Sequence, residues 1–356
     1  VETAMANLDQ IVVGDNSADY YESLADALAD INAGTRDKTT KVSETAKVKV
    51  YTAHDGRVTV MLLADVTEVQ TPLVERSIDI SLAGHTLTLA AGVYLYAKAG
   101  VDCRILGGID PATSKRGKIV SALSAPTNGV VMLVACGGRE LVCQGVDFSA
   151  TAATSNAVYG VYGLSGCERI SMRECVVELE NSSETSGGAY GVATMDAATK
   201  TVLEHCSINV VSADSNAIAV YYMGDITVSQ STLEVTAEKG AAANVLNNNN
   251  GCNTVVTGCQ MKATAVTGGT ARILYSHLGG PTQIHNCVAE VRAVSQGHAT
   301  ALLITEKGVV TVEDSTIKAV VQSNEDQQYA VAVENYGLLQ AKNTVFYADG
   351  QGGNAS

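Results

Sequence analysis

Four charged residues occupy equivalent positions in successive segments of the chain and could do chemistry if they met on one surface: Glu234, Lys262, Glu290 and Lys318. Carboxylates beside a basic group can transfer protons in a cleavage reaction. The alternating signs also predict plain ion pairs between neighbouring strands, and such pairs contribute only about 0.2–1 kcal/mol each. We therefore expect a row of surface ion pairs and assign no catalytic residues.

Nine cysteines are the second chemically reactive group. Four of them, Cys175, Cys206, Cys259 and Cys287, recur at one position among apolar neighbours, which is typical of small buried thiols. Disulfides between Cys175 and Cys206 or between Cys259 and Cys287 are the alternative, because stacked strands lie about 4.8 Å apart. The other cysteines contain no C-x-x-C pair, so we expect no zinc site, and we predict no other metal and no cofactor.

A repeat of about 24 to 32 residues, present eight times from Thr127 onward, must position all of these side chains. Each copy has an apolar run, a turn at Gly or Asn, a second apolar run, a polar break of two residues and a third run. Such a unit cannot bury its apolar side alone, so the copies must stack on one another. The sequence therefore predicts an all-β fold, a single-stranded parallel β-helix with three short strands in each coil.

Alternation of apolar residues places the second strands of the repeats in register. One inward column contains Val146, Cys175, Cys206, Ser231, Cys259, Cys287, Ser315 and Thr344. A second, two residues later, contains Phe148, Val177, Ile208, Leu233, Met261, Ala289, Ile317 and Phe346. A two-residue polar corner, such as His285-Asn286, precedes the first column in every repeat and lets the chain turn within the stack.

The first strand of each repeat has a second face that the same alternation predicts to point outward. In each first strand we assign the initial alanine and every second residue after it to the inward face, for example Ala157, Tyr159 and Val161. The residues between them then point outward, and this outward set is unusually apolar. We expect a binding surface or interface formed by Val158, Tyr162, Tyr190, Val192, Ile218, Val220, Tyr222, Leu246, Leu274, Leu302 and Ile304. An exposed apolar patch of roughly several hundred Å² usually marks an interface.

Three interpretations compete for this predicted face. Loops of the same chain, within 33–47 or after 181–188, could cover it. Another copy or a partner protein could pack against it, as a long flat sheet allows. A glycan could stack on Tyr162, Tyr190 and Tyr222, because tyrosine offers a ring face with a polar tip.

The N-terminal region predicts a helix over about 20–32, with Tyr21, Leu24, Leu28 and Ile31 on one face. Such a helix could cap the open end of the solenoid. The following polar stretch predicts a loop. We therefore divide the chain into an N-terminal segment, 1–47, and a parallel β-helix, 48–356.

The repeat resembles the right-handed parallel β-helix proteins of the pectate-lyase-like superfamily, from about Val48 to Ala348. The beginning of the chain resembles bacterial cell-surface, adhesin-type β-helix proteins. A right-handed winding is implied by the resemblance and by the general handedness of parallel crossovers. The clustered Asp pairs and neighbouring Arg-x-Lys of pectin-hydrolysing relatives are absent from these columns, which favours a noncatalytic protein.

Charge and hydropathy exclude two classes of partner. The net charge of −14, from 23 basic and 37 acidic residues, argues against nucleic acid, because phosphate-binding surfaces need clustered Lys and Arg. There is no run of 18 apolar residues, so the sequence predicts no membrane span.

Both ends of the chain carry expectations. The start at Val1-Glu2 is typical of a mature or trimmed chain. The last strand, 344–348, precedes a short polar tail, so we expect either further chain beyond it or a last coil that docks on another subunit.

We expect a noncatalytic bacterial protein, extracellular or on the cell surface, that acts in adhesion, surface architecture or self-assembly. Its expected partners are other copies, lateral or end to end, or a surface glycan or protein. The alternatives are a carbohydrate-active enzyme, either a polysaccharide lyase or a glycosidase, and a phage tail or fibre component.

Overall fold

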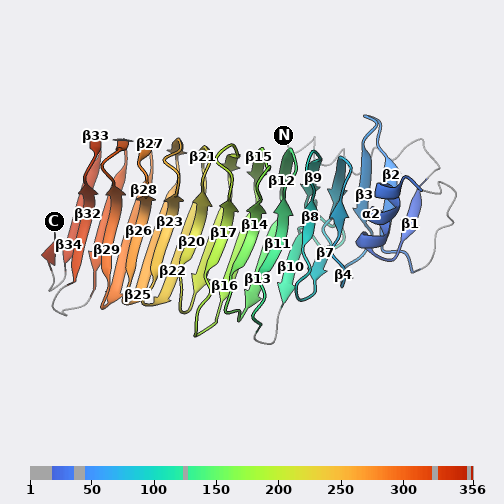
Figure 1. Ribbon diagram of the computed structural model, residues 1–356, viewed down its shortest axis with the longest axis horizontal. Helices are drawn as coiled ribbons and strands as arrows, with labels where there is room; N and C mark the ends of the chain where they lie inside the picture. The colour runs from blue at the N-terminus through green and yellow to red at the C-terminus, as the bar shows by residue number, and fades with distance from the viewer. Residues whose placement is uncertain (1–17, 36–44, 123–126, 323–327, 351–353, 356) are drawn as a thin grey trace.

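The chain forms an all-β parallel solenoid with one short helix (Figure 1). The computed structural model describes residues 18–35, 45–122, 127–322, 328–350 and 354–355. Successive coils stack along the long axis, and each coil contributes one strand to each of three sheets. The predicted parallel stack of coils is confirmed.

The three sheets have 13, 11 and 11 strands and are named here sheets A, B and C. Sheet A contains β1 (Asp19–Tyr21), β2 (Val48–Thr52), β3 (Val58–Leu62), β6 (Ile78–Ser81), β9 (Asp102–Leu106), β12 (Glu140–Gln144), β15 (Arg169–Arg173), β18 (Lys200–Glu204), β21 (Ile226–Ser229), β24 (Thr254–Thr257), β27 (Gly280–His285), β30 (Gly308–Glu313) and β33 (Leu338–Lys342). Sheet B contains β4 (Val66–Glu68), β7 (Thr86–Leu89), β10 (Lys118–Ala122), β13 (Asp147–Ala152), β16 (Val176–Asn181), β19 (Ser207–Ser212), β22 (Thr232–Lys239), β25 (Gln260–Thr267), β28 (Val288–Ser295), β31 (Thr316–Val321) and β34 (Val345–Gly350). Sheet C contains β5 (Leu73–Val74), β8 (Leu95–Ala97), β11 (Val131–Cys136), β14 (Val158–Gly163), β17 (Ala189–Thr194), β20 (Ala217–Tyr222), β23 (Ala242–Asn248), β26 (Thr270–Ser276), β29 (His298–Ile304), β32 (Tyr329–Asn335) and β35 (Asn354–Ala355).

The polar corner between sheets A and B has one backbone geometry in all eight repeats. Its second residue has a positive φ, between 48° and 65°, at Gly145, Glu174, His205, Gln230, Gly258, Asn286, Asp314 and Asn343. The N–H of Gly145 donates to the carbonyl of Arg173 on the next coil, and the later corners repeat this bond up to Asp314. A left-handed residue therefore turns the chain without leaving an unpaired backbone donor.

The two predicted inward columns are confirmed: the second lies within sheet B, and the first is formed by the residue just before each of its strands from β13 to β34. Phe148 pairs with Val177 and Val177 with Ile208, and the register continues to Phe346. The four column cysteines are buried, and all nine cysteines of the chain are free. The thiol ladder is therefore confirmed, and the alternative of disulfide pairs is not what the structure contains.

The predicted facing of sheet C is wrong for most of its residues. Eight side chains expected outside are fully buried in the core: Val158, Val192, Val220, Tyr222, Leu246, Leu274, Leu302 and Ile304. Ile218 stands on the outer face but is only 3% exposed. Tyr162 and Tyr190 do lie on the outer face and are partly exposed.

For seven of these eight residues the cause is a break of alternation in the middle of the sheet C strand. Val158 precedes the break and was placed outside because the alternation was counted from Ala157, whereas Val158 is the residue that pairs with Ala189. In β14 both Gly160 and Val161 face inward: a Cβ at Gly160 would lie 3.0 Å from a methyl of Val177, and Val161 is fully buried. Residues on both sides of Gly160 pair with the neighbouring strands in one register, but Gly160 and its equivalents, such as Gly191 and Ala219, are not themselves paired. Two consecutive inward residues reverse the facing of everything that follows in the strand.

The N-terminal region differs from its prediction in detail. The helix α2 spans Leu24–Ala33, so it begins four residues later than expected. Ser23 is its N-cap, with Oγ accepting from the N–H of Asp26, and Gly34 ends it with φ of 71°. Tyr21 belongs to β1, which pairs antiparallel with β2, and β2 pairs antiparallel with β3. The predicted polar loop falls largely in 36–44, outside the described residues.

Glu68 holds the first turn of α2 against the solenoid. Its carboxylate accepts hydrogen bonds from the backbone N–H groups of Leu24, at 2.5 Å, and Ala25, at 3.3 Å. The side chain is only 2% exposed, and burial, opposed by these two bonds, raises the pKa of the Glu68 carboxyl above its ordinary 4.5. Folding therefore favours the protonated form, and the free energy of unfolding should fall as pH rises from 4.5 through the raised pKa.

We expect Glu68→Gln to remove this fall, because an amide oxygen still accepts a hydrogen bond but does not titrate. Urea unfolding of both proteins between about pH 4 and pH 8 measures the difference. Glu68→Leu, which leaves buried N–H groups without an acceptor, should be about 1–3 kcal/mol less stable than Glu68→Gln at every pH, because neither side chain titrates. Parallel pH profiles for the wild type and Glu68→Gln would contradict the assignment.

Candidate functional site

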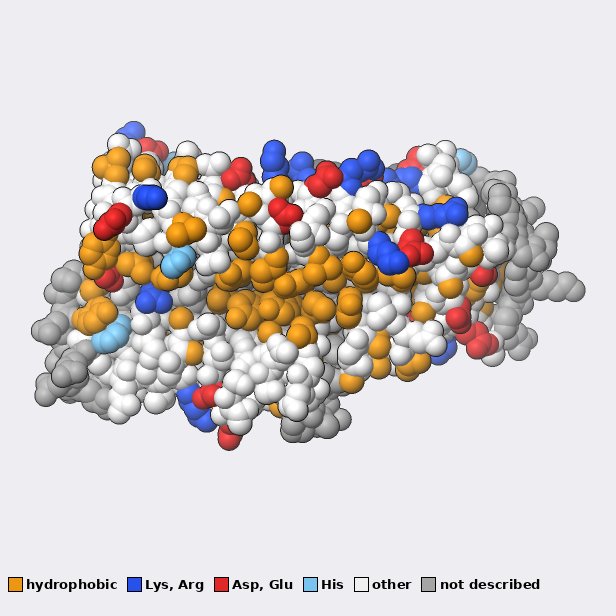
Figure 2. Space-filling model, viewed as in Figure 1, with side chains coloured by type: hydrophobic (Ala, Val, Ile, Leu, Met, Phe, Trp, Pro, Cys, Tyr) orange, Lys and Arg blue, Asp and Glu red, His pale blue; other side chains and the backbone are white. Residues whose placement is uncertain are grey.

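The outer face of sheet C carries two columns of side chains along the long axis. One contains Met132, Tyr159, Tyr190, Ile218, Asn244, Arg272, Thr300 and Val331. The other contains Tyr96, Ala135, Tyr162, Ala193, Tyr221, Asn247, Tyr275, Leu303 and Glu334. Figure 2 shows apolar side chains gathered in a band over the middle of this face, across β11, β14, β17 and β20.

Four tyrosines in this band touch one another and are named here the tyrosine ridge: Tyr159, Tyr162, Tyr190 and Tyr221. The rings of Tyr159 and Tyr190 stack with centroids 5.0 Å apart and an interplanar angle of 21°. Tyr162 lies 4.6 Å from Tyr159 in a tilted arrangement, and Tyr221 meets Tyr190 edge-on at 6.1 Å. The ridge is a continuous aromatic surface built on three successive coils.

Small residues between the rings give the ridge its shape. Ala135 lies between Tyr96 and Tyr162 in the column, and Ala193 lies between Tyr162 and Tyr221. Both alanines are on the outer face, yet both have no exposed surface, because the large neighbours cover them. Rings in this column therefore stand on alternate rungs, with room to lie across the alanine between them.

The ridge hydroxyls stay neutral. Burial is the first cause that raises the pKa of Tyr159, Tyr162, Tyr190 and Tyr221, and charge on neighbouring tyrosines adds to it for the first three. Each phenol therefore remains able to donate and accept a hydrogen bond at neutral pH. The ridge offers apolar ring faces with polar edges.

Sequence reasoning found half of the ridge. Tyr162 and Tyr190 were predicted, whereas Tyr159 and Tyr221 were assigned inward. The adjacent pair Tyr221-Tyr222 gave no signal for which ring faces the core. The Tyr222 hydroxyl lies inside, 2.8 Å from Thr254 Oγ1, and Tyr221 stands outside.

The described residues do not fold over the ridge, and Figure 2 shows it open. The turn within 182–188 reaches only the edge of Tyr190, where a Cβ at Gly188 would meet the ring. The other proposed cover, within 33–47, lies largely outside the described residues. The ridge is thus the exposed aromatic feature from which a function can be argued.

The row of charges on sheet B pairs with itself. Lys262 Nζ lies 2.6 Å from Glu234 Oε1, and Lys318 Nζ lies 3.5 Å from Glu290 Oε2. Asp79 in sheet A is held between Arg57 and Arg104. These carboxylates have charge partners, and within the described residues no group of three or more His, Cys, Asp or Glu is arranged to hold a metal ion.

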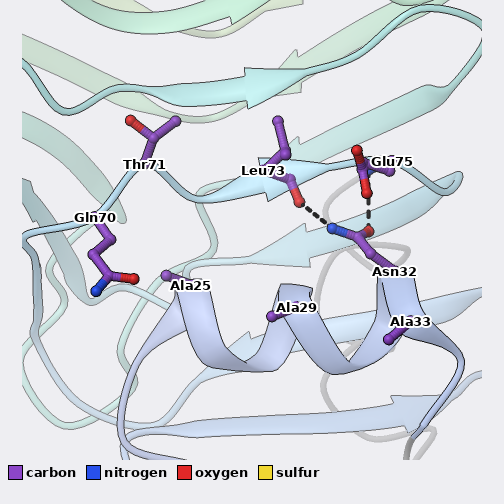
Figure 3. A pocket seen from close by; sticks show the side chains of 8 residues that line it. All are labelled: Ala25, Ala29, Asn32, Ala33, Gln70, Thr71, Leu73 and Glu75. Carbon is purple, nitrogen blue, oxygen red and sulfur yellow. Dashed lines mark hydrogen bonds between the residues drawn. The ribbon is translucent and has the colours of Figure 1, made fainter.

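A cavity of about 440 Å³ lies between α2 and β5 (Figure 3). Asn32 Nδ2 donates to the carbonyl of Leu73 at 2.8 Å, and Asn32 Oδ1 accepts from the N–H of Glu75 at 3.1 Å. Ala25 and Ala29 form the helix side. Because Asn32 is satisfied by protein partners, its amide ties α2 to sheet C.

Apolar side chains of the last strands are also exposed, among them Leu338, Val345 and Tyr347. Within the part of the chain that the structure describes, no helix has the length and hydropathy to cross a bilayer.

Comparisons of the chain with protein-family models, with curated protein sequences and with solved structures find no significant match.

Proposed function

We propose that this protein is a noncatalytic β-helix that binds a glycan along the tyrosine ridge, outside a bacterial cell, in adhesion or surface architecture. The observation that supports it is the row of partly exposed tyrosine rings in mutual contact on an open sheet face. Sugar rings present apolar C–H faces with hydroxyls at their edges, which complement aromatic faces with phenol edges. A stacked sheet holds the rings in place before binding, which lowers the entropic cost of recognition.

Affinity electrophoresis and calorimetry against a panel of polysaccharides test this proposal. We expect Tyr159→Ala with Tyr190→Ala to weaken glycan binding by about fivefold to a hundredfold. Two aromatic contacts of about 0.5–1.5 kcal/mol each are lost, and 1.4 kcal/mol is a factor of ten. Tyr347→Ala is the matched control, because Tyr347 is 48% exposed on the outer face of sheet B.

Equal affinity in the ridge double variant and the Tyr347→Ala control would refute a binding role for the ridge. Formation of unsaturated sugars or new reducing ends during incubation would instead favour the alternative of a carbohydrate-active enzyme. A phage tail or fibre component remains a third candidate, and a trimer in solution would favour it.

Association between copies is a further proposal for the exposed apolar side chains of the last strands. Burial of such residues against a second copy would remove apolar surface from water. Sedimentation over a wide concentration range tests it, and a stable monomer throughout would contradict it.

We also propose that α2 caps the end of the stack and that the coils wind right-handed, as in the pectate-lyase-like superfamily. Burial of Leu24, Leu28 and Ile31 within the common core supports the capping role. The handedness follows the general rule for parallel crossovers. A crystal structure with α2 detached or with left-handed coils would contradict this.

A further inference from the structure

Next to the tyrosine ridge, the outer face of sheet C changes from aromatic to polar. Asn244, Arg272 and Thr300 follow Ile218 in the same column, on β23, β26 and β29. His298 faces the same side two residues before Thr300. We name Asn244, Arg272, His298 and Thr300 the polar strip.

The polar strip contains buried polar atoms without hydrogen-bond partners in the described structure: Asn244 Oδ1, Arg272 Nε, His298 Nδ1 and Thr300 Oγ1. Asn244 is 4% exposed and Thr300 is 1% exposed. Native proteins rarely leave buried polar atoms unsatisfied, because each costs about 1–3 kcal/mol. Several on neighbouring strands of one face indicate a place prepared for polar groups from outside the chain.

Arg272 is the positively charged residue of the polar strip. Seven of the other arginines on the solenoid lie in ion pairs with carboxylates: Arg57, Arg104, Arg116, Arg139, Arg169, Arg173 and Arg292. Arg76, beside the end of α2, has no ion pair with a described carboxylate. Arg272 forms no ion pair with any described carboxylate, and its guanidinium carbon lies 5.2 Å from the centre of the Tyr275 ring. Nearby Glu334 accepts a hydrogen bond from the Tyr336 hydroxyl at 2.8 Å.

Burial lowers the pKa of Arg272, because a guanidinium is costly to remove from water, and the charge of the nearby Glu334 carboxylate is among the weaker causes that oppose this shift. Burial, and then the charge of Arg272, lower the pKa of His298 below 6.5, so His298 is uncharged at neutral pH. The strip therefore presents one positive charge beside neutral donors and acceptors. An anion of one charge is the matching ligand.

Aromatic surface flanks the strip on both sides. The rings of His298 and Tyr329 stack at 3.9 Å, and Tyr275 lies beside Arg272 in the second column. A sugar ring resting on these faces would lie over Asn244 and Thr300, whose side chains must turn outward to reach its hydroxyls, since they are only 4% and 1% exposed. Its charged substituent would then reach Arg272.

We infer that the polar strip recognises a sugar unit bearing one negative charge, a carboxylate or a sulfate ester, within a glycan that extends onto the tyrosine ridge. This inference rests on the proposed glycan binding and adds the charge of the ligand. Arg272 supplies the charge-assisted hydrogen bonds, and the neighbouring rings of Tyr275 and Tyr329 offer the sugar apolar faces.

The test compares a uronic-acid polysaccharide with the same polymer after chemical reduction of its carboxylates to neutral hydroxymethyl groups, and includes a sulfated glucan as a third arm. Binding by calorimetry should be at least about tenfold tighter for one of the anionic polymers than for the neutral one. Arg272→Met should abolish that preference while leaving the affinity for the neutral polymer unchanged. Arg292→Met, which removes an arginine already paired with Glu290, should keep the preference.

The outcomes separate the two proposals. Equal wild-type affinity for neutral and anionic polymers, or an unchanged preference in Arg272→Met, overturns the inference about the strip but leaves glycan binding intact. If the ridge double variant no longer binds the neutral polymer, glycan binding along the tyrosine ridge is supported independently of the polar strip. No binding to any polymer overturns both proposals, and unchanged thermal unfolding of each variant shows that the fold is retained.

Discussion

Leu302→Asp should prevent folding or lower the free energy of unfolding by at least about 3–5 kcal/mol, whereas Leu303→Asp should give soluble, folded protein. Leu302 is fully buried and pairs with Leu274 and Val333 inside the stack. An aspartate there would be a buried charge without a partner, which costs several kcal/mol. Leu303 stands on the outer face beside Tyr275, where a carboxylate meets water.

The two leucines are adjacent and identical in type, so each variant controls for the other. Soluble yield, circular dichroism and the midpoint of urea unfolding report the outcome. Strict alternation from Ala299 predicts the reverse ranking, with Leu303 inside and Leu302 outside. A folded Leu302→Asp protein and an unfolded Leu303→Asp protein would refute the facing of sheet C described here.

Tyr222→Ala should lower the free energy of unfolding by about 3–5 kcal/mol, because it deletes one of the largest fully buried side chains and leaves a cavity. It also removes the partner of the Thr254 hydroxyl, at 2.8 Å. Tyr221→Ala should cost no more than about 1.5 kcal/mol, since it loses mainly the edge-on contact with Tyr190.

Binding should respond in the opposite order. Tyr221→Ala removes part of the tyrosine ridge and should weaken glycan binding. Tyr222→Phe keeps the buried ring and should leave binding unchanged. Equal losses of stability in the two alanine variants would contradict the assignment of Tyr222 to the core and Tyr221 to the outer face.

Sheet B and its corners were predictable because two signals agreed there. The polar pair at each corner, such as Glu204-His205, marks the turn, and the apolar residues after it alternate without interruption. Small residues at the column, cysteine or serine, fit the crowded interior beside the turn. The structure places each of them as the alternation requires.

Sheet C could not be resolved from the pattern because its strands are apolar on both faces. The two consecutive inward residues, Gly160 and Val161 in β14, leave no polar residue to mark the change of facing. Outward alanines such as Ala193 have the composition of a core position, since tyrosine rings cover them. The one available signal was the succession of tyrosine and alanine on neighbouring rungs, which suits rings lying across small neighbours.

The alternation places Asn244, Arg272 and Thr300 outward, as the structure has them, but the sequence does not mark them as a site. Arg272 follows Ala271 in an ordinary apolar strand, and one arginine carries no signal by itself. Arg272 becomes a candidate binding residue only in the structure, where it forms no ion pair with a described carboxylate. Asn244 and Thr300 on the adjacent coils also have polar atoms without hydrogen-bond partners there.

The central claim is that ligand binds along the outer face of sheet C, and hydroxyl-radical footprinting tests it most directly. The protein is oxidised alone and with the polysaccharide that retains it most strongly in affinity electrophoresis, and labelled side chains are quantified by mass spectrometry. The account predicts protection of Met132, Tyr159, Tyr162, Tyr190 and Tyr221, with Tyr347 on sheet B unchanged. Protection confined to sheets A and B or to the ends of the solenoid, with the tyrosine ridge still fully reactive, would contradict it.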